Sequence, residues 1–122
     1  MTGKELLEAY PKAAEIVVKY YSEQFIKSIE AGDVSDEIKE YAKGQTIDLE
    51  YIATFMDINP RGLFDVFDSN QVYIEISILI DANPIFMYHV NGEVNTEPFY
   101  TSRIGAEKAA IEKAFQILNN KL

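Results

Sequence analysis

The spacing of apolar residues changes at Gln71, and this change constrains the fold more than any other feature of the sequence. Before Gln71, apolar residues recur every three or four positions, which is the period of one face of a helix. In VYIEISILI, residues 72–80, they alternate with their neighbours, as in a strand with one buried face. We therefore expect residues 1–70 to be mainly helical, residues 71–101 to form a sheet, and residues 102–122 to form a last helix.

Several residues indicate where the helices of the first part begin. Thr2 starts the pattern of a capping box, in which two side chains bond each other's backbone amides. Pro11 lies inside an apolar run, so we expect a kink there or a new helix after a short turn. Further helices are predicted over residues 35–44 and 46–58, the second with Thr46 as its cap. The side chains expected to face inward from this second helix are Leu49, Ile52, Phe55 and Met56.

Turn residues divide the sheet region into three strands. DANP, residues 81–84, separates the first strand from IFMYHV, residues 85–90. The pair NG that begins at Asn91 is the strongest short signal for a tight hairpin, so we expect a third strand over residues 93–101. These elements predict a single α+β domain over residues 1–122. Its N-terminal helices precede a three-stranded antiparallel meander, and its long C-terminal helix packs on the sheet.

The composition limits the chemistry and the location of the protein. With 122 residues, of which 48% are hydrophobic, the chain can form one domain with a core. The absence of cysteine excludes disulfides, thiolate metal sites and a cysteine nucleophile, and it fits a reducing compartment. The sequence has neither the apolar segment of a signal peptide nor a run of about 18 apolar residues, so we expect a cytoplasmic protein without membrane contact. No nucleophile motif or phosphate-binding glycine loop is present, and we expect a non-enzymatic protein without a cofactor.

Charge is distributed unevenly along the chain. The net charge is −9, and no Lys or Arg occurs in residues 62–102. The acids of this stretch are Asp65, Asp68, Glu75, Asp81, Glu93 and Glu97. A nucleic-acid-binding face needs the opposite charge, so direct binding to DNA or RNA is not expected. The acidity either keeps the protein dissolved or forms a face for cationic partners. In the extreme case it imitates nucleic acid, as in small phage-encoded inhibitors, which requires carboxylates spaced like phosphates on one surface.

The second predicted strand has apolar residues on both faces. Phe86, Tyr88 and Val90 point one way, and Ile85 and Met87 point the other. Either the N-terminal helices cover one face and the C-terminal helix the other, or one face binds a partner. We favour a bacterial or phage binding protein whose partner is another protein or a second copy of this chain. The residues predicted to form the binding surface are Glu75, Phe86, Tyr88, Glu93 and Glu97.

The segment DINPRGLFDVFD, residues 57–68, has some features of a calcium-binding loop. The residues at oxygen-ligand positions of such a loop are Asp57, Asn59, Asp65 and Asp68. Arg61, however, would place a positive charge inside the cage, and Asp68 is shorter than the usual bidentate Glu. The alternative is a helix capped by Asn59 and started by Pro60. We keep a divalent-metal site at these residues as an alternative hypothesis to protein binding.

The last part of the chain resembles a double-stranded RNA-binding domain. AEKAAIEKAFQIL, residues 106–118, follows three predicted strands and is similar to the final helix of that family. The resemblance covers residues 71–122, about half the chain, and implies a helix packed on a three-stranded sheet. That family has a cluster of lysines at the start of this helix, which contacts phosphates. Here the equivalent segment, TSRIGAE, has one Arg followed by a Glu, so the resemblance implies a shared topology without RNA binding.

Overall fold

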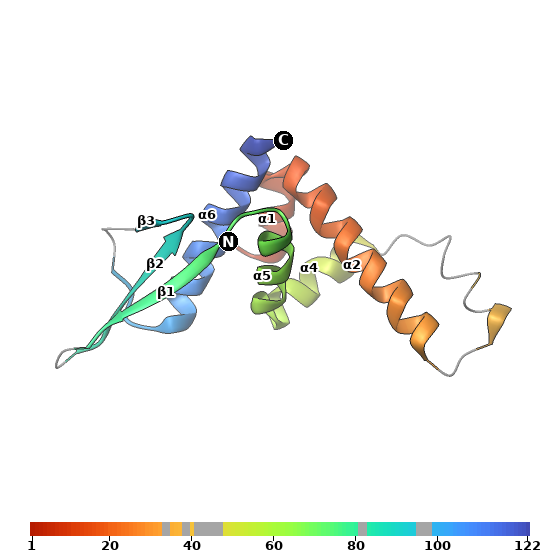
Figure 1. Ribbon diagram of the computed structural model, residues 1–122, viewed down its shortest axis with the longest axis horizontal. Coiled ribbons are helices and arrows are strands. Elements are labelled where there is room, and N and C mark those ends of the chain that lie inside the picture. Colours follow the sequence, from red (N-terminus) through yellow and green to blue (C-terminus); the bar gives the residue numbers. More distant parts are fainter. Residues whose placement is uncertain (33–34, 38–39, 41–47, 81–82, 95–98) are drawn as a thin grey trace.

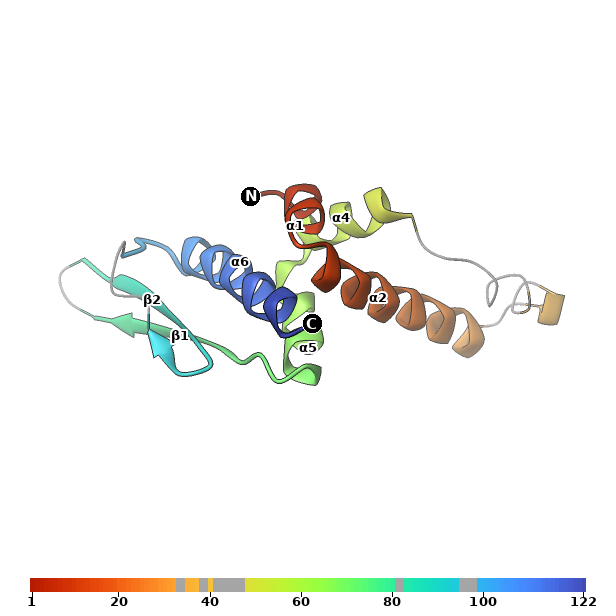
Figure 2. The same cartoon turned by 90° about the horizontal axis from the view of Figure 1, so that it is seen from above.

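The computed structural model describes residues 1–32, 35–37, 40, 48–80, 83–94 and 99–122 and confirms the predicted α+β fold. The long helix α6 lies between the sheet and the N-terminal helices and contacts both (Figures 1 and 2). The elements in chain order are α1 (Gly3–Ala9), α2 (Pro11–Ala31), α4 (Leu49–Ile58), the 3₁₀ helix η1 (Pro60–Gly62), α5 (Leu63–Ser69), β1 (Ile74–Leu79), β2 (Ile85–Val90), β3 (Glu93–Val94) and α6 (Arg103–Lys121).

The first two helices are separate, as one of the two alternatives at Pro11 predicted. The capping box of α1 is present, with Thr2 Oγ1 accepting from the backbone N–H of Glu5 at 3.2 Å. Pro11 is the first residue of α2, where its missing N–H costs no helical hydrogen bond. Asn119 of α6 accepts hydrogen bonds from two amides in the first turn of α2, the nearer at 2.9 Å. The start of α2 is therefore held against the end of α6.

Helix α4 differs from its prediction at its start and on its exposed side. Its cap is Asp48, whose side chain accepts from the Glu50 N–H at 3.1 Å, and not Thr46. Thr46 and most of the helix predicted over residues 35–44 lie outside the described residues. Ile52 and Met56 are buried as expected. The prediction was wrong for Leu49 and Phe55, which are 43% and 45% exposed, because the helix is covered on one side only among the described residues.

The sheet is an antiparallel meander in the order β1-β2-β3, with Ile74 opposite Val90. Asn91 and Gly92 both have left-handed backbone angles, with φ of 52° and 83°, as a two-residue hairpin of this kind requires. The described third strand is only two residues long, and residues 95–98 lie outside the description. Tyr100 then returns to β2 and forms an isolated bridge with Phe86. The central strand is therefore β2.

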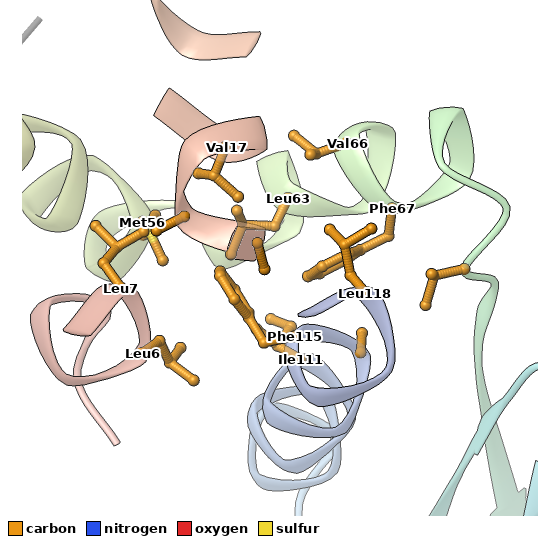
Figure 3. Close-up of a cluster of buried hydrophobic side chains, with 14 of the residues drawn as sticks. Leu6, Leu7, Val17, Met56, Leu63, Val66, Phe67, Ile111, Phe115 and Leu118 are labelled. Atoms are coloured by element: carbon orange, nitrogen blue, oxygen red, sulfur yellow. The ribbon is translucent and has the colours of Figure 1, made fainter. Parts of the chain in front are cut away.

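The core lies between α6 and the helices around it (Figure 3). Phe115 and Leu118 of α6 point toward Phe67 of α5, and the rings of Phe67 and Phe115 meet edge to face with centroids 5.4 Å apart. Both rings are completely buried. Ala110 and Ala114 are also completely buried, and such small side chains allow a helix to approach its neighbours closely. The resulting cluster extends from α1 to Val90 of the sheet.

Candidate functional site

One face of the sheet has no cover in the described part of the chain. Partners in an antiparallel ladder share a face, and Ile74 with Val90 belong to the face that packs on α6. No helix is drawn on the opposite side of β1 and β2 (Figures 1 and 2). The N-terminal helices pack on α6 instead, so the expected alternative in which they cover the second sheet face is wrong. We call this second face the outer sheet face; its residues are Glu75, Ser77, Leu79, Ile85, Met87, His89 and Val94.

The outer sheet face is apolar at the end where Leu79 pairs with Ile85, and its other end holds the polar pair Glu75 and His89 beside Val94. Leu79 is 56% exposed and Val94 is 44% exposed. The hydroxyl of Ser77 and Nε2 of His89 lie 2.7 Å apart, so these polar groups are engaged with each other. Glu75 is the only carboxylate among the residues that define the face. Such a surface is better suited to contact with another apolar surface than to catalysis.

The predicted binding residues are not gathered on one face. Phe86 and Tyr88 lie on the side of β2 that faces α6, where both are half-buried. Glu75 lies on the outer sheet face, whereas Glu93 pairs with the inward-facing Val90 and is exposed at the edge. Glu97 lies outside the described residues. Alternation along β2 explains this separation, because every second residue belongs to the face that α6 covers.

Both inward-facing aromatic residues have specific neighbours. The guanidinium of Arg103, at the start of α6, lies 5.8 Å from the centroid of the Phe86 ring, within reach of a cation–π contact. Burial raises the pKa of the Tyr88 hydroxyl, and Tyr100 and Glu112 raise it further. The rings of Tyr88 and Tyr100 are 6.2 Å apart between centroids. These side chains therefore hold the sheet on α6.

The proposed calcium loop is helical in the structure. Asp57 is in the last turn of α4, and its Oδ1 accepts from the Gly3 N–H at 2.8 Å. Asn59 lies between α4 and η1 and makes no side-chain capping bond, although Pro60 does start η1 as expected. Asp65 and Asp68 are exposed on α5. Across the described ranges, no group of three or more His, Asp or Glu side chains is arranged to hold a metal ion.

Arg61, which the metal hypothesis placed inside the loop, forms an ion pair with Glu107 of α6. Its Nε donates to both carboxylate oxygens of Glu107 at 3.2 Å, and a terminal nitrogen donates to Oε1 at 2.9 Å. Glu107 is only 7% exposed, so it needs these charge-assisted bonds. The bonds to Glu107 raise the pKa of Arg61. This pair joins η1 to the first turns of α6 and is structural.

A second feature, which the sequence did not predict as a site, is a hollow between α2, α4 and α5. Its volume is about 370 Å³, and five aromatic side chains line it. We call it the aromatic pocket; the residues that line it are Tyr20, Tyr21, Gln24, Phe25, Ser28, Tyr51, Ile52, Phe55, Gly62 and Asp65. The sequence held a signal for two of the five rings, since Tyr51 and Phe55 are four positions apart and share one helix face.

The rings of the aromatic pocket are close together but not stacked. Tyr20 and Tyr21 meet edge to face with centroids 5.6 Å apart and planes at 86°. Tyr21 and Phe55 are 5.9 Å apart at 62°, and Phe55 and Tyr51 are 6.3 Å apart at 32°. The ring planes therefore differ in orientation from one ring of the series to the next.

One carboxylate influences two hydroxyls of the pocket. Burial raises the pKa of Tyr21 to about 12, and Tyr20 and Asp65 add to the shift. The pKa of Tyr20 is also raised, by burial first and then by Asp65. The hydroxyl of Tyr21 is buried and has no hydrogen-bond partner among the described residues. It lies over Gly62, where an added Cβ would come within 3.1 Å of the hydroxyl oxygen.

Comparison with models of protein families, with curated proteins and with solved structures found no match for this chain. No family model supports the likeness to double-stranded RNA-binding domains, which stays a prediction. None of the described helices combines the length and apolar character that crossing a lipid bilayer requires. Any function has to be inferred from the outer sheet face and the aromatic pocket themselves.

Proposed function

We propose that the protein works in the cytoplasm as a small non-enzymatic binding protein whose outer sheet face contacts a protein partner. One observation carries the proposal: α6 packs on one face of the sheet, while Leu79 and Val94 are exposed on the other. The absence of cysteine fits a reducing compartment. The sequence also has none of the nucleophile or phosphate-loop motifs that would favour an enzyme.

The composition of the outer sheet face supports a contact rather than simple solvation. An antiparallel sheet with one solvated face normally alternates between apolar residues inside and polar residues outside. Here Ile85 and Met87 of β2 point outward, as does Leu79 at the end of β1, so the alternation of residue type is lost on β2 and at the end of β1. Burial of such side chains by a partner is favourable by about 25 cal/mol per Å² of apolar surface.

The charge around this face favours a partner other than a second copy. The outer sheet face carries the carboxylate of Glu75, and Glu93 is exposed at the adjacent edge. Residues 62–102 contain no Lys or Arg, and the whole chain has a net charge of −9. Two copies would bring like charges together, whereas a partner with an apolar centre and basic residues at its rim would be complementary. We therefore propose a basic-rimmed protein partner.

The acids do not support the nucleic-acid-mimicking alternative as the main proposal. Asp65 and Asp68 are on α5, whereas Glu75 and Glu93 are on the sheet. A phosphate-like array needs carboxylates along one continuous surface, and these are divided between two parts of the molecule.

The proposed contact can be tested with two matched substitutions. Leu79→Glu places a charge in the outer sheet face, and Ile58→Glu places one at an apolar position on α4 that is even more exposed. A protein captured from the source cells with the wild-type chain is purified, and its affinity for each variant is measured. We expect Leu79→Glu to weaken binding at least about tenfold and Ile58→Glu to leave it unchanged.

Two results would contradict this function. Equal affinity of the captured protein for both variants would place the contact elsewhere. A concentration-dependent doubling of mass in light scattering that Leu79→Glu abolishes would show that the face binds a second copy, contrary to the charge argument. Weakening of the captured complex by salt is expected if basic residues lie at the partner's rim.

A further inference from the structure

We propose that the aromatic pocket binds a methylated ammonium group, either in a small quaternary amine or in a methylated lysine side chain. This inference is independent of the partner proposed for the outer sheet face. It rests on the rings that surround the pocket, on the carboxylate beside them, and on the mainly apolar surface of its walls.

The rings are placed where one cation can contact several of them. Attraction between a cation and an aromatic ring is significant within about 6 Å of the ring centroid. Neighbouring centroids in the series Tyr20, Tyr21, Phe55, Tyr51 are 5.6, 5.9 and 6.3 Å apart. A single positive group in the hollow can therefore lie within range of more than one ring. Phe25 adds a fifth aromatic wall from α2.

The charge of the pocket has the sign that a cation requires. Asp65 lines it, is exposed, and has no ion pair among the described residues. No Lys, Arg or His is among the lining side chains. Asp65 lines the pocket together with Tyr20 and Tyr21 and adds to the raised pKa of both hydroxyl groups, after burial. The net charge of −9 favours the approach of cations in general.

The chemistry of the walls selects a methylated ammonium over an unmodified one. An unmodified lysine ammonium has three N–H donors and is strongly hydrated, so it loses water at a cost unless acceptors replace it. The pocket is mainly apolar, and Asp65 is the only charged side chain among the residues that line it. A trimethylammonium group keeps the positive charge but has no N–H donors to satisfy. Aromatic rings with one carboxylate meet those needs.

The size of the pocket leaves room for more than the charged group. A volume of about 370 Å³ is at the lower end of the range for small-molecule sites, roughly 300–1,000 Å³. The hollow can therefore also hold the short alkyl chain that carries the ammonium group in choline or in trimethyllysine. These two sources share the chemistry that the pocket recognises, and the experiment below separates them.

The first test compares a cation with a neutral molecule of the same shape. Choline and 3,3-dimethylbutan-1-ol differ in having nitrogen or carbon at the branched centre, so only choline is charged. Both are titrated into the full chain and followed by NMR shifts of the tyrosine rings. We expect choline to shift the rings of the pocket and to bind at least about tenfold more tightly than the alcohol. Equal affinity for the two would show an apolar pocket without cation selectivity and would overturn the proposal.

The second test uses variants that remove single features of the pocket. Asp65→Asn removes the charge and keeps the size of the side chain, and Tyr51→Ala removes one wall. Each is expected to weaken choline binding by about threefold or more. Tyr73→Ala is the matched control, because Tyr73 precedes β1 and has nearly the same exposure as Tyr51, 56% against 59%. Thermal melting of each variant in parallel shows whether it is folded.

The third test identifies the source of the ammonium group. A short peptide with one trimethyllysine and the same peptide with unmodified lysine are titrated alongside choline. Tighter binding of the methylated peptide than of choline would assign the pocket to a protein ligand, and the reverse to a small molecule. No ring shifts with either cation at millimolar concentration would refute the proposal. Leu79→Glu should leave choline binding unchanged, so failure here is distinct from failure of the outer sheet face.

Discussion

Two aromatic clusters of the helical part share an edge-to-face contact but differ in burial. Phe67 and Phe115 meet edge to face at 5.4 Å and are completely buried. Tyr21 and Phe55 meet at a similar angle at 5.9 Å, yet Phe55 is 45% exposed. The first pair is enclosed by three helices and the sheet, whereas the second borders a hollow. Edge-to-face geometry alone therefore does not distinguish a core from a binding pocket, and burial does.

The largest expected effect is a matched pair of truncations in the two clusters. Phe115→Ala should lower the free energy of unfolding by about 3–5 kcal/mol, because it removes a buried ring and leaves a cavity. Phe55→Ala should cost less than about 2 kcal/mol, because much of that ring is already in water. Urea unfolding of both variants gives the comparison. Similar losses would mean that the pocket rings are part of the core.

The second expected effect concerns the pair that joins η1 to α6. Arg61→Met should lower the melting temperature, because it leaves the buried carboxylate of Glu107 without its donors. The change should be smaller than that of Phe115→Ala, because the Arg61 side chain is itself largely exposed. Lys4→Met is a close control, since Lys4 has the same side-chain exposure as Arg61, 61%, but pairs with an exposed Glu50 at 4.0 Å. The control should not change the melting temperature measurably. Equal changes in both variants would show that the burial of Glu107 is unimportant.

The sequence predicted what local patterns encode and missed what depends on distant contacts. The change of period at Gln71, the hairpin at Asn91 and the helix start at Pro11 each depend on a few neighbouring residues, and all three are present. The partner of Arg61 could not be foreseen, because Glu107 is 46 positions away. The exposure of Phe55 depends in the same way on which sides of α4 other elements cover. The aromatic pocket was missed for this reason.

The third expected effect concerns the buried hydroxyl of Tyr21, whose ring lines the aromatic pocket. Tyr21→Phe should raise the free energy of unfolding at neutral pH by about 1 kcal/mol or less, because it removes a buried hydroxyl that has no partner among the described residues. Tyr73→Phe, at an exposed position, should change nothing. A loss of stability in Tyr21→Phe would show that the hydroxyl is hydrogen-bonded in solution.

The same residue predicts how stability changes in alkali. The pKa of Tyr21 is raised to about 12 in the folded chain, above the ordinary value of about 10 for tyrosine in an unfolded one. Below about pH 10 the hydroxyl is protonated in both states and stability does not depend on pH through this group. As the pH rises from about 10 toward about 12, the unfolded chain loses the proton first, so stability falls. In Tyr21→Phe this part of the alkaline loss should be absent. Melting temperatures of both proteins between pH 8 and 12 test the sign.

The smallest expected effect on stability separates the clusters most clearly. Tyr51→Ala should change the free energy of unfolding by no more than about 0.5 kcal/mol, because Tyr51 is mostly exposed and packs only along one side. A ligand that binds only the folded chain raises its melting temperature, so choline should stabilise the wild type and stabilise Tyr51→Ala less. A core substitution should not combine an unchanged stability with a weaker effect of choline, since Phe115→Ala lowers stability with or without the ligand. If choline stabilises both proteins equally, Tyr51 does not take part in binding choline, and the rings of the aromatic pocket are an exposed part of the core.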